Sequence, residues 1–454
     1  MNAEHRMRHR KTAESVALEV ADRLRDPAAV VATSVRSPTA PSSNITASAW
    51  DPLALGNGHV GISLLFAHLG QRHGRPDPAT HHHLSAAVVE LERKEHGGGG
   101  SLFRGAPAVA FAAAAAAQDP GHYRRLLSTL DDMVAARANQ LVRIEEERVN
   151  LARAGTSPRG YDAISGLAGL GRYTLGRGDS LLSCTRSILR CLVRLTDPVT
   201  VKGRPVPGWW IAEKPPPSHG TPFNQGYFDL GIAHGIAGPL ALLALAARHG
   251  VSVPGQRDAI ERIAQWLLDW QLTDDYGPSW PTTVSLEEEC QDQPPPVLRT
   301  RGTAWCYGAP GIARALQVAG HVMGRPEWER SAVAATNATL SRERDRAMLH
   351  DAGLCHGWSG LLQCVIRIAD HADDPLLRSR IPELVDHVVD HFDPATEFGF
   401  RAYSPLPQPG WYLDDAGYLE GAAGIALALL TAADLDRPAD SRKAMPWDAA
   451  LLIT

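Results

Sequence analysis

Long hydrophobic runs and long runs of Lys and Arg are both missing from this 454-residue chain. Its most apolar stretch, residues 108–117, is mostly alanine and too short to cross a bilayer. Residues 1–26 begin basic but contain no uninterrupted apolar segment, so they predict an amphipathic first helix and not a signal peptide. No run of Lys and Arg forms the positive surface of a nucleic-acid-binding protein, and the net charge is -5. We therefore exclude nucleic acid as a partner and expect a cytoplasmic protein.

Cysteine is scarce as well, and the six residues are too few for a disulfide scaffold. They lie at positions 184, 191, 290, 306, 355 and 364. In a reducing compartment, cysteines in a distinctive context more often bind a metal or act in catalysis. Those at 184, 191 and 364 lie in apolar helical patterns, which favours small buried side chains. Cys306 and Cys355 each lie two residues before the first glycine of a Gly-x-x-Gly unit, and His356 follows Cys355 directly.

Several well-known catalytic motifs are absent. The chain has no His-Glu-x-x-His, no P-loop and no dinucleotide-binding fingerprint after a predicted strand. The segment "GWSGL" at 357–361 is not the Gly-x-Ser-x-Gly of a nucleophile elbow. A Cys–His hydrolase built on Cys355 and His356 is an alternative, but the side chains of adjacent residues rarely point at each other.

What the chain does contain is a repeat. A Gly-x-x-Gly unit or a close relative, followed by an apolar helical segment, begins at Gly58, Gly105, Gly166, Gly235, Gly308, Gly357 and Gly421. The intervening segments, such as 258–272 and 377–392, are amphipathic. Alternating apolar and amphipathic helices predict an all-α fold, an α/α toroid of seven inner and seven outer helices. An open α-solenoid, which uses the same alternation, is the alternative.

The pattern divides the chain into three parts. We expect an N-terminal helical segment over residues 1–49, an α/α toroid catalytic domain over 50–433 and a C-terminal tail over 434–454. Two insertions within the toroid, 198–226 and 276–300, are rich in Pro, Trp and β-branched residues and predict loops or short hairpins. The three histidines at 81–83 predict a polar helix entry.

The repeat places the candidate functional residues in a common register. The residues directly before the first glycines are Asn57, Arg104, Ser165, His234, Tyr307, His356 and Glu420. Those two before them are Gly56, Phe103, Ile164, Ala233, Cys306, Cys355 and Leu419. Equivalent positions converge in a closed toroid, so Cys306, Cys355 and His356 are expected to meet at one end. Two thiolates and one imidazole suit Zn²⁺ and leave its fourth position open, as in catalytic zinc sites. A purely structural zinc, with Cys364 as a fourth ligand, is the alternative.

At these residues the sequence resembles the LanC family of class I lantibiotic (lanthipeptide) cyclases. The resemblance runs through residues 50–433 and is carried by "YDAISGLAG", "GIAHGIAG", "WCYG", "CHG" and "YLEGAAGIALALL", in the family's order. It implies an α/α toroid with Zn²⁺ held by Cys306, Cys355 and His356. It also implies further active-site residues at Asp162, His234 and Tyr307. The arginine that the family places four residues before the first zinc cysteine is replaced by Gly302, and Arg301 lies one residue earlier.

The resemblance implies an antibiotic-biosynthesis enzyme that forms thioether rings. Its substrate would be a dehydrated ribosomal precursor peptide, leader plus core, with a dehydratase and a transporter as partners in a membrane-associated complex. Zinc would activate a substrate cysteine for Michael addition to dehydroalanine or dehydrobutyrine. His234 would act as general acid/base, oriented by Asp162, while Arg301 would meet the enolate charge. Simpler roles are a core histidine for His234, a helix cap for Asp162 and packing for Tyr307.

Two other functions remain open. A related enzyme that adds glutathione to dehydroamino acids would keep the zinc site and differ in the pocket. A non-catalytic scaffold of a peptide-modifying complex is the second, although intact zinc ligands argue against it.

Overall fold

The computed structural model describes residues 3–36, 50–93, 99–213, 225–290, 303–404, 411–435 and 445–454. It consists of two compact units, and each is built from two separate stretches of chain. The first unit comprises Met1–Asp131 with Leu349–Trp447, and the second comprises Asp132–Met348 with Asp448–Thr454.

A buried helix follows each of the seven glycine units. Six of these motif helices begin at the residue after the first glycine, and α10 begins two residues after it. The motif helices are α3 (His59–Arg72), α5 (Ala106–Ala116), α8 (Leu167–Gly176), α10 (Ala237–Arg248), α13 (Ala309–Met323), α16 (Trp358–Ala372) and α18 (Ala422–Ala433). Their Ala- and Leu-rich sequences are good helix formers and apolar on all sides, which explains why every residue of α5 is buried.

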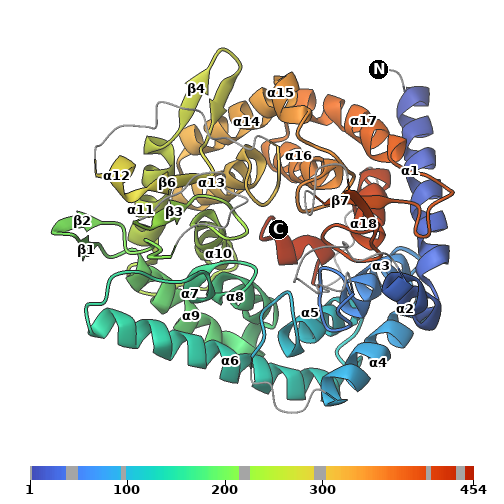
Figure 1. Ribbon diagram of the computed structural model, residues 1–454, viewed down its shortest axis with the longest axis horizontal. Helices are drawn as coiled ribbons and strands as arrows, with labels where there is room; N and C mark the ends of the chain where they lie inside the picture. The colour runs from blue at the N-terminus through green and yellow to red at the C-terminus, as the bar shows by residue number, and fades with distance from the viewer. Residues whose placement is uncertain are drawn as a thin grey trace. The chain divides into compact units, whose positions relative to one another are not determined.

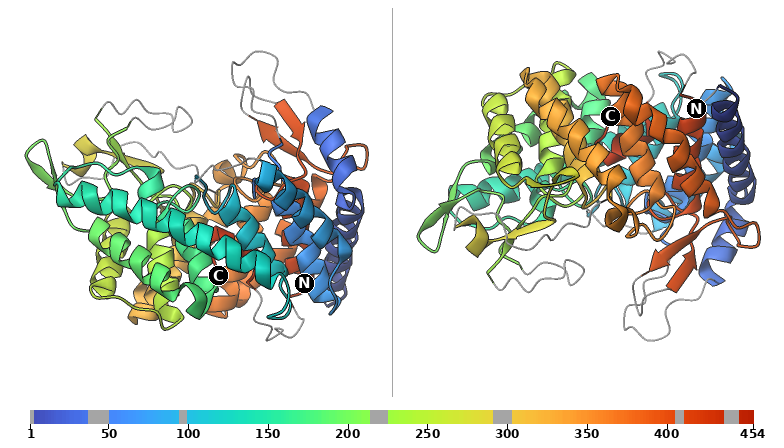
Figure 2. Two further views of the ribbon diagram at one scale, coloured as in Figure 1. Left: turned by 90° about the horizontal axis from the view of Figure 1, so that it is seen from below. Right: turned by 90° about the horizontal axis from the view of Figure 1, so that it is seen from above.

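Amphipathic helices alternate with the motif helices along the chain. They are α1 (Ala3–Leu24), α4 (Pro78–Arg93), α6 (Arg124–Asn150), α9 (Leu182–Leu195), α11 (Gln256–Asp269), α14 (Pro326–Ser341) and α17 (Pro375–Asp390). Within the units, α4 packs on α3, α9 on α8, α11 on α10, α14 on α13 and α17 on α16. The N-terminal helix α1 covers the last motif helix, α18, and also contacts α17 (Figure 1 and Figure 2). The N-terminal helix and the last motif helix are therefore joined within the first unit.

Neighbouring motif helices follow the order of the repeats. In the first unit α16 contacts α18, α18 contacts α3, and α3 contacts α5, while in the second unit α8 contacts α10 and α10 contacts α13. The contact between α18 and α3 joins the seventh repeat to the first. A closed array has such a contact and an open solenoid lacks it.

The loops before the motif helices are also joined by backbone hydrogen bonds. In the first unit, Cys355 N–H donates to Leu419 O at 2.9 Å and Leu419 N–H donates to Gly56 O at 3.1 Å. Leu55 N–H in turn donates to Phe103 O at 2.9 Å. Four of these residues lie two before the first glycine of their repeat, so the register found in the sequence is a register of spatial neighbours.

The second unit repeats this connection. Ala163 N–H donates to Ala233 O at 3.0 Å, and Ala233 N–H donates to Cys306 O at 3.4 Å. Within this unit, the loops before α8, α10 and α13 are thereby linked in chain order.

Short antiparallel pairs make up the strands of the described residues. They are β1 (Val199–Val201) with β2 (Arg204–Val206), β3 (Tyr227–Asp229) with β6 (Thr283–Ser285), β4 (Leu272–Asp274) with β5 (Gly277–Ser279), and β7 (Arg401–Ser404) with β8 (Trp411–Asp414). The β1–β2 hairpin lies in the predicted insertion 198–226, and β5 and β6 lie in 276–300. Strand β3 leads directly into the loop before α10, with Phe228 opposite Val284.

Short helices complete the description. They are α2 (Pro27–Arg36), α7 (Pro158–Tyr161), α12 (Leu286–Glu289), α15 (Glu343–Arg346), η1 (Gly178–Leu181) and η3 (Trp447–Leu451). Among the helices of the described ranges, none combines the length and the apolar character needed to cross a bilayer.

Candidate metal and proton-transfer site

Three of the motif loops contain the same hydrogen bond to an aspartate side chain. In each, an aspartate side chain accepts a hydrogen bond from the backbone N–H of the glycine two residues later. The pairs are Asp229 with Gly231 at 2.9 Å, Asp351 with Gly353 at 2.9 Å, and Asp415 with Gly417 at 2.6 Å. The sequence signal is Asp-x-Gly-x-x-x-Gly at 229–235, 351–357 and 415–421, which the sequence interpretation missed. These hydrogen bonds fix the loops that carry His234, Cys355 and His356.

His234 and Asp162 form a direct pair in the second unit. The Nδ1 atom of His234 lies 2.7 Å from Oδ2 of Asp162, whose side chain is completely buried, whereas 36% of the His234 side chain is exposed. The other carboxylate oxygen of Asp162 accepts the backbone N–H of Ser165 at 2.6 Å. Asp162 therefore shapes its own turn and also holds the histidine, while Gly166 is the N-cap of α8.

The electrostatics of this pair favour a bound proton. Burial lowers the pKa of His234, but the hydrogen bond and charge of Asp162 outweigh it, and the pKa is raised above 6.5. Burial also raises the pKa of Asp162, against the opposing hydrogen bond from His234. Nearby Asp229 is buried as well, and burial raises its pKa to about 7. The pair thus retains its shared proton at a higher pH than an isolated histidine would.

Tyr307 and Cys306 lie next to this pair. The Tyr307 ring stacks on the His234 ring, with centroids 5.9 Å apart and 24° between the planes. A side chain at Gly231 would overlap the carbonyl oxygen of Cys306, so this close approach of two loops requires glycine. Trp305 anchors the Cys306 loop by donating from Nε1 to Leu451 O at 3.0 Å. The second unit therefore brings together four of the predicted site residues.

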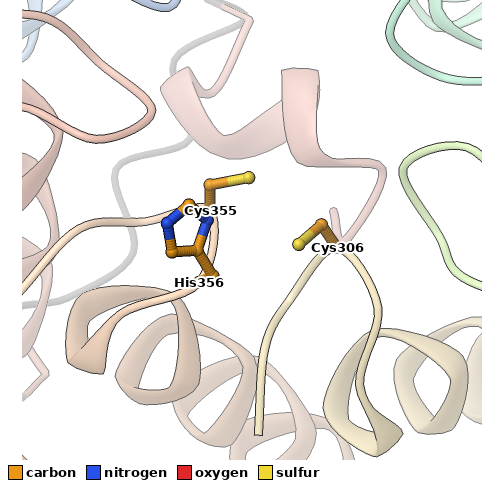
Figure 3. Close-up of side chains that lie close together, drawn as sticks. All are labelled: Cys306, Cys355 and His356. Carbon is orange, nitrogen blue, oxygen red and sulfur yellow. The ribbon is translucent and has the colours of Figure 1, made fainter. Parts of the chain in front are cut away.

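Cys355 and His356 lie on the loop before α16 in the first unit, and Cys306 lies on the loop before α13 (Figure 3). The Nδ1 atom of His356 is 3.3 Å from Oε1 of Glu420. Ligand atoms of Asp351, His356 and Glu420 all lie within 4.8 Å of one another. The thiol and imidazole donors of Cys355 and His356 are types that bind Zn²⁺.

Arg301 lies outside the described residues, which resume at Thr303. The position of its guanidinium is therefore still a prediction. Glu420 was named in the register of the sequence but was given no role there. The signal that points to it is its place in the seventh repeat, equivalent to that of His356 in the sixth.

The chain is similar to known proteins in sequence and in fold. The family model described as lanthionine synthetase C-like protein matches residues 49–452. The nisin biosynthesis protein NisC of Lactococcus lactis subsp. lactis is 24% identical over 267 residues, covering 58% of this chain and 60% of that protein. A solved structure of nisin cyclase superposes with a TM-score of 0.70 at 22% identity, covering 88% of this chain and 92% of that chain. This likeness confirms the predicted all-α toroid fold. The chain belongs to the lanthionine synthetase C-like family.

Proposed function

We propose that this protein is a zinc-dependent peptide cyclase that forms lanthionine-type thioether rings. Its substrate would be a dehydrated ribosomal precursor peptide. The reaction joins the sulfur of a peptide cysteine to the β-carbon of a dehydroalanine or dehydrobutyrine in the same peptide. Family membership and the name of the matched relative, a nisin biosynthesis protein, support this class of reaction.

We assign the metal to Cys306, Cys355 and His356. The support is the loop register, because within each unit consecutive loops are joined at equivalent positions. Cys306 occupies this position in the loop before α13, and Cys355 occupies it in the loop of the next repeat along the chain. Zinc bound by these residues would lower the pKa of a substrate thiol and so supply a thiolate at neutral pH.

The proton is handled by the chain's own residues. Asp162 accepts the Nδ1–H of His234 and thereby leaves Nε2 to exchange a proton with the substrate. After the sulfur adds, the α-carbon of the former dehydroamino acid must gain a proton, and protonated His234 can donate it. Tyr307 limits the rotation of the His234 ring by stacking on it. Arg301 is the candidate cation for the enolate charge.

The Asp162–His234 pair beside the Cys306 loop is the observation that carries this proposal. A non-catalytic scaffold has no need of a proton donor next to soft metal ligands. As partners we propose the dehydratase that prepares the peptide and the transporter that exports it.

The test uses the full-length protein and a chemically or enzymatically dehydrated cysteine-containing peptide. Ring closure leaves the peptide mass unchanged but removes a thiol that can be alkylated, so alkylation followed by mass spectrometry measures it. We expect Cys355→Ala to lose both bound zinc and ring closure, with the helical content retained. Cys290→Ala, a partly exposed cysteine away from the motif loops, is the matched control. Retained stoichiometric zinc in Cys355→Ala would remove Cys355 from the ligand set.

A further inference from the structure

Residues 448–453 are enclosed within the second unit. Each of them is 0% exposed, so the segment lies entirely in the interior. It belongs to this unit together with Asp132–Met348, although the residue just before it, Trp447, belongs to the first unit. Buried backbone groups need hydrogen-bond partners, so the position of the segment depends on the side chains that bind its carbonyls.

Two buried side chains of the second unit bind these carbonyls. Trp305 donates from Nε1 to Leu451 O at 3.0 Å, and Arg314 on α13 donates from Nε to Ile453 O at 2.8 Å. Trp305 is 0% exposed and Arg314 is 3% exposed. Loss of either donor would take a hydrogen bond from a buried carbonyl, which is costly. The two hydrogen bonds therefore hold the segment in one position.

The bond to Leu451 also fixes the loop of a proposed metal ligand, because Trp305 directly precedes Cys306. The backbone of this loop is constrained at neighbouring points as well. Cys306 O accepts the N–H of Ala233 at 3.4 Å, and Trp305 O lies where a Cβ at Gly311 would overlap it. The Trp305 indole adds a tie on the side of the buried segment.

We propose that Trp305 is a positioning residue of the metal site. Its indole anchors the Cys306 loop on residues 448–453 and so presents the Cys306 thiolate to the metal in one position. Arg314 supports this role indirectly, because it holds the same segment. The inference rests on the proposed zinc ligation by Cys306. Residues that orient a metal ligand without touching the metal typically contribute about 10- to 100-fold to metal affinity.

Zinc affinity of the full-length protein, measured by competition with a chelator, tests this role. Trp305→Phe keeps a buried aromatic ring and removes the N–H donor, so we expect it to bind zinc about tenfold more weakly than wild type. Arg314→Met releases the same segment at Ile453. It should weaken zinc binding less than Trp305→Phe does, because it acts on Cys306 only through the segment.

Trp280→Phe is the matched control. Trp280 is 2% exposed and also donates from Nε1 to a backbone carbonyl, that of Leu267 at 2.7 Å. Leu267 lies on α11, which carries none of the proposed ligands. The control therefore loses the same kind of buried hydrogen bond and should bind zinc as wild type does.

Cobalt spectroscopy separates positioning from a general loss of stability. With Co²⁺ in place of zinc, we expect the thiolate-to-cobalt charge-transfer band to shift or weaken in Trp305→Phe and to stay as in wild type in Trp280→Phe. Both variants should lower the unfolding temperature of the zinc-free protein. Equal zinc affinities and equal cobalt spectra in these two variants would overturn the inference, and so would wild-type zinc affinity in both Trp305→Phe and Arg314→Met.

Cys306→Ala distinguishes this inference from the proposed function. If Cys306→Ala binds zinc as tightly as wild type, the ligand assignment itself fails. If Cys306→Ala loses zinc while Trp305→Phe keeps full affinity, the ligand assignment stands and only the role of Trp305 is rejected.

Discussion

The Nδ1 atom of His234 lies 2.7 Å from the Oδ2 atom of Asp162, a carboxylate with no solvent exposure. Because the raised pKa of His234 depends on this charge, we expect Asp162→Asn to lower that pKa and slow ring closure about 100-fold at pH 7. His234→Asn should be slowed at least as much, with bound zinc retained. Initial rates of thiol loss from a dehydrated peptide provide the measurement.

The pH dependence of these rates tests the same pair. An acid is active while protonated, so its contribution is present below the pKa of His234 and is lost as pH rises through it. Asp162→Asn should therefore move the alkaline limb of the rate profile to lower pH. Asp258→Asn, an exposed aspartate on α11, is the control. An alkaline limb at the wild-type position in Asp162→Asn would contradict this role.

The Tyr307 ring, not its hydroxyl, is expected to matter. Tyr307→Phe keeps the stacked ring and should close rings at nearly the wild-type rate. Tyr307→Ala removes the contact, which is worth roughly 0.5–1.5 kcal/mol, and should slow closure up to about tenfold. An equal loss in both variants would show instead that the hydroxyl takes part in the reaction.

A buried histidine pair predicts acid sensitivity of the first unit. His83 donates from Nε2 to Leu24 O at 2.9 Å, so its Nδ1 is left to accept the Nδ1–H of His59 at 3.0 Å. Burial lowers the pKa of both histidines to about 4. The unfolded chain takes up these protons near pH 6.5 and the folded one near pH 4, so stability falls as pH drops between these values. One such shift corresponds to about 3 kcal/mol.

Urea unfolding at pH 7.5 and pH 5 checks this expectation. His83→Gln should be less stable than wild type at pH 7.5, because it loses the contact with His59, and should lose less stability on acidification. His82→Gln, its exposed neighbour on α4, should behave as wild type. If His83→Gln keeps the full acid effect, the pair is not its source.

Gly424→Ala tests the close packing of α18 against the loops before α18 and α16. A Cβ at this position would overlap the carbonyl oxygen of Tyr418 and contact Leu354 at 2.7 Å. The backbone cannot yield easily, so we expect a loss of about 1–3 kcal/mol in the free energy of unfolding. Gly99→Ala, where an added Cβ meets nothing within 4 Å, is the control. Equal stabilities of the two variants would contradict the packing argument.

Much of the fold was predictable because the repeat can be recognised from the spacing of its glycine units along the chain. Gly308 and Gly357 precede the starts of α13 and α16 directly. Contacts between residues that lie far apart in the sequence were not predictable from this spacing. His83 was assigned to a polar helix entry, yet it is completely buried, because the apolar residues of α4 turn it toward His59 while His81 and His82 stay exposed.

The sequence by itself determined the helical class, the seven-fold register and the residues with metal-binding and proton-transfer chemistry, since spacing and residue type are properties of the chain. Only the tertiary structure decided which of these residues are partners. The Asp162–His234 hydrogen bond joins residues 72 positions apart, and the hydrogen bond from Leu419 N–H to Gly56 O joins the loop of the last repeat to that of the first. Hydrogen bonding is short-ranged and directional, so such choices follow from the folded geometry and not from spacing.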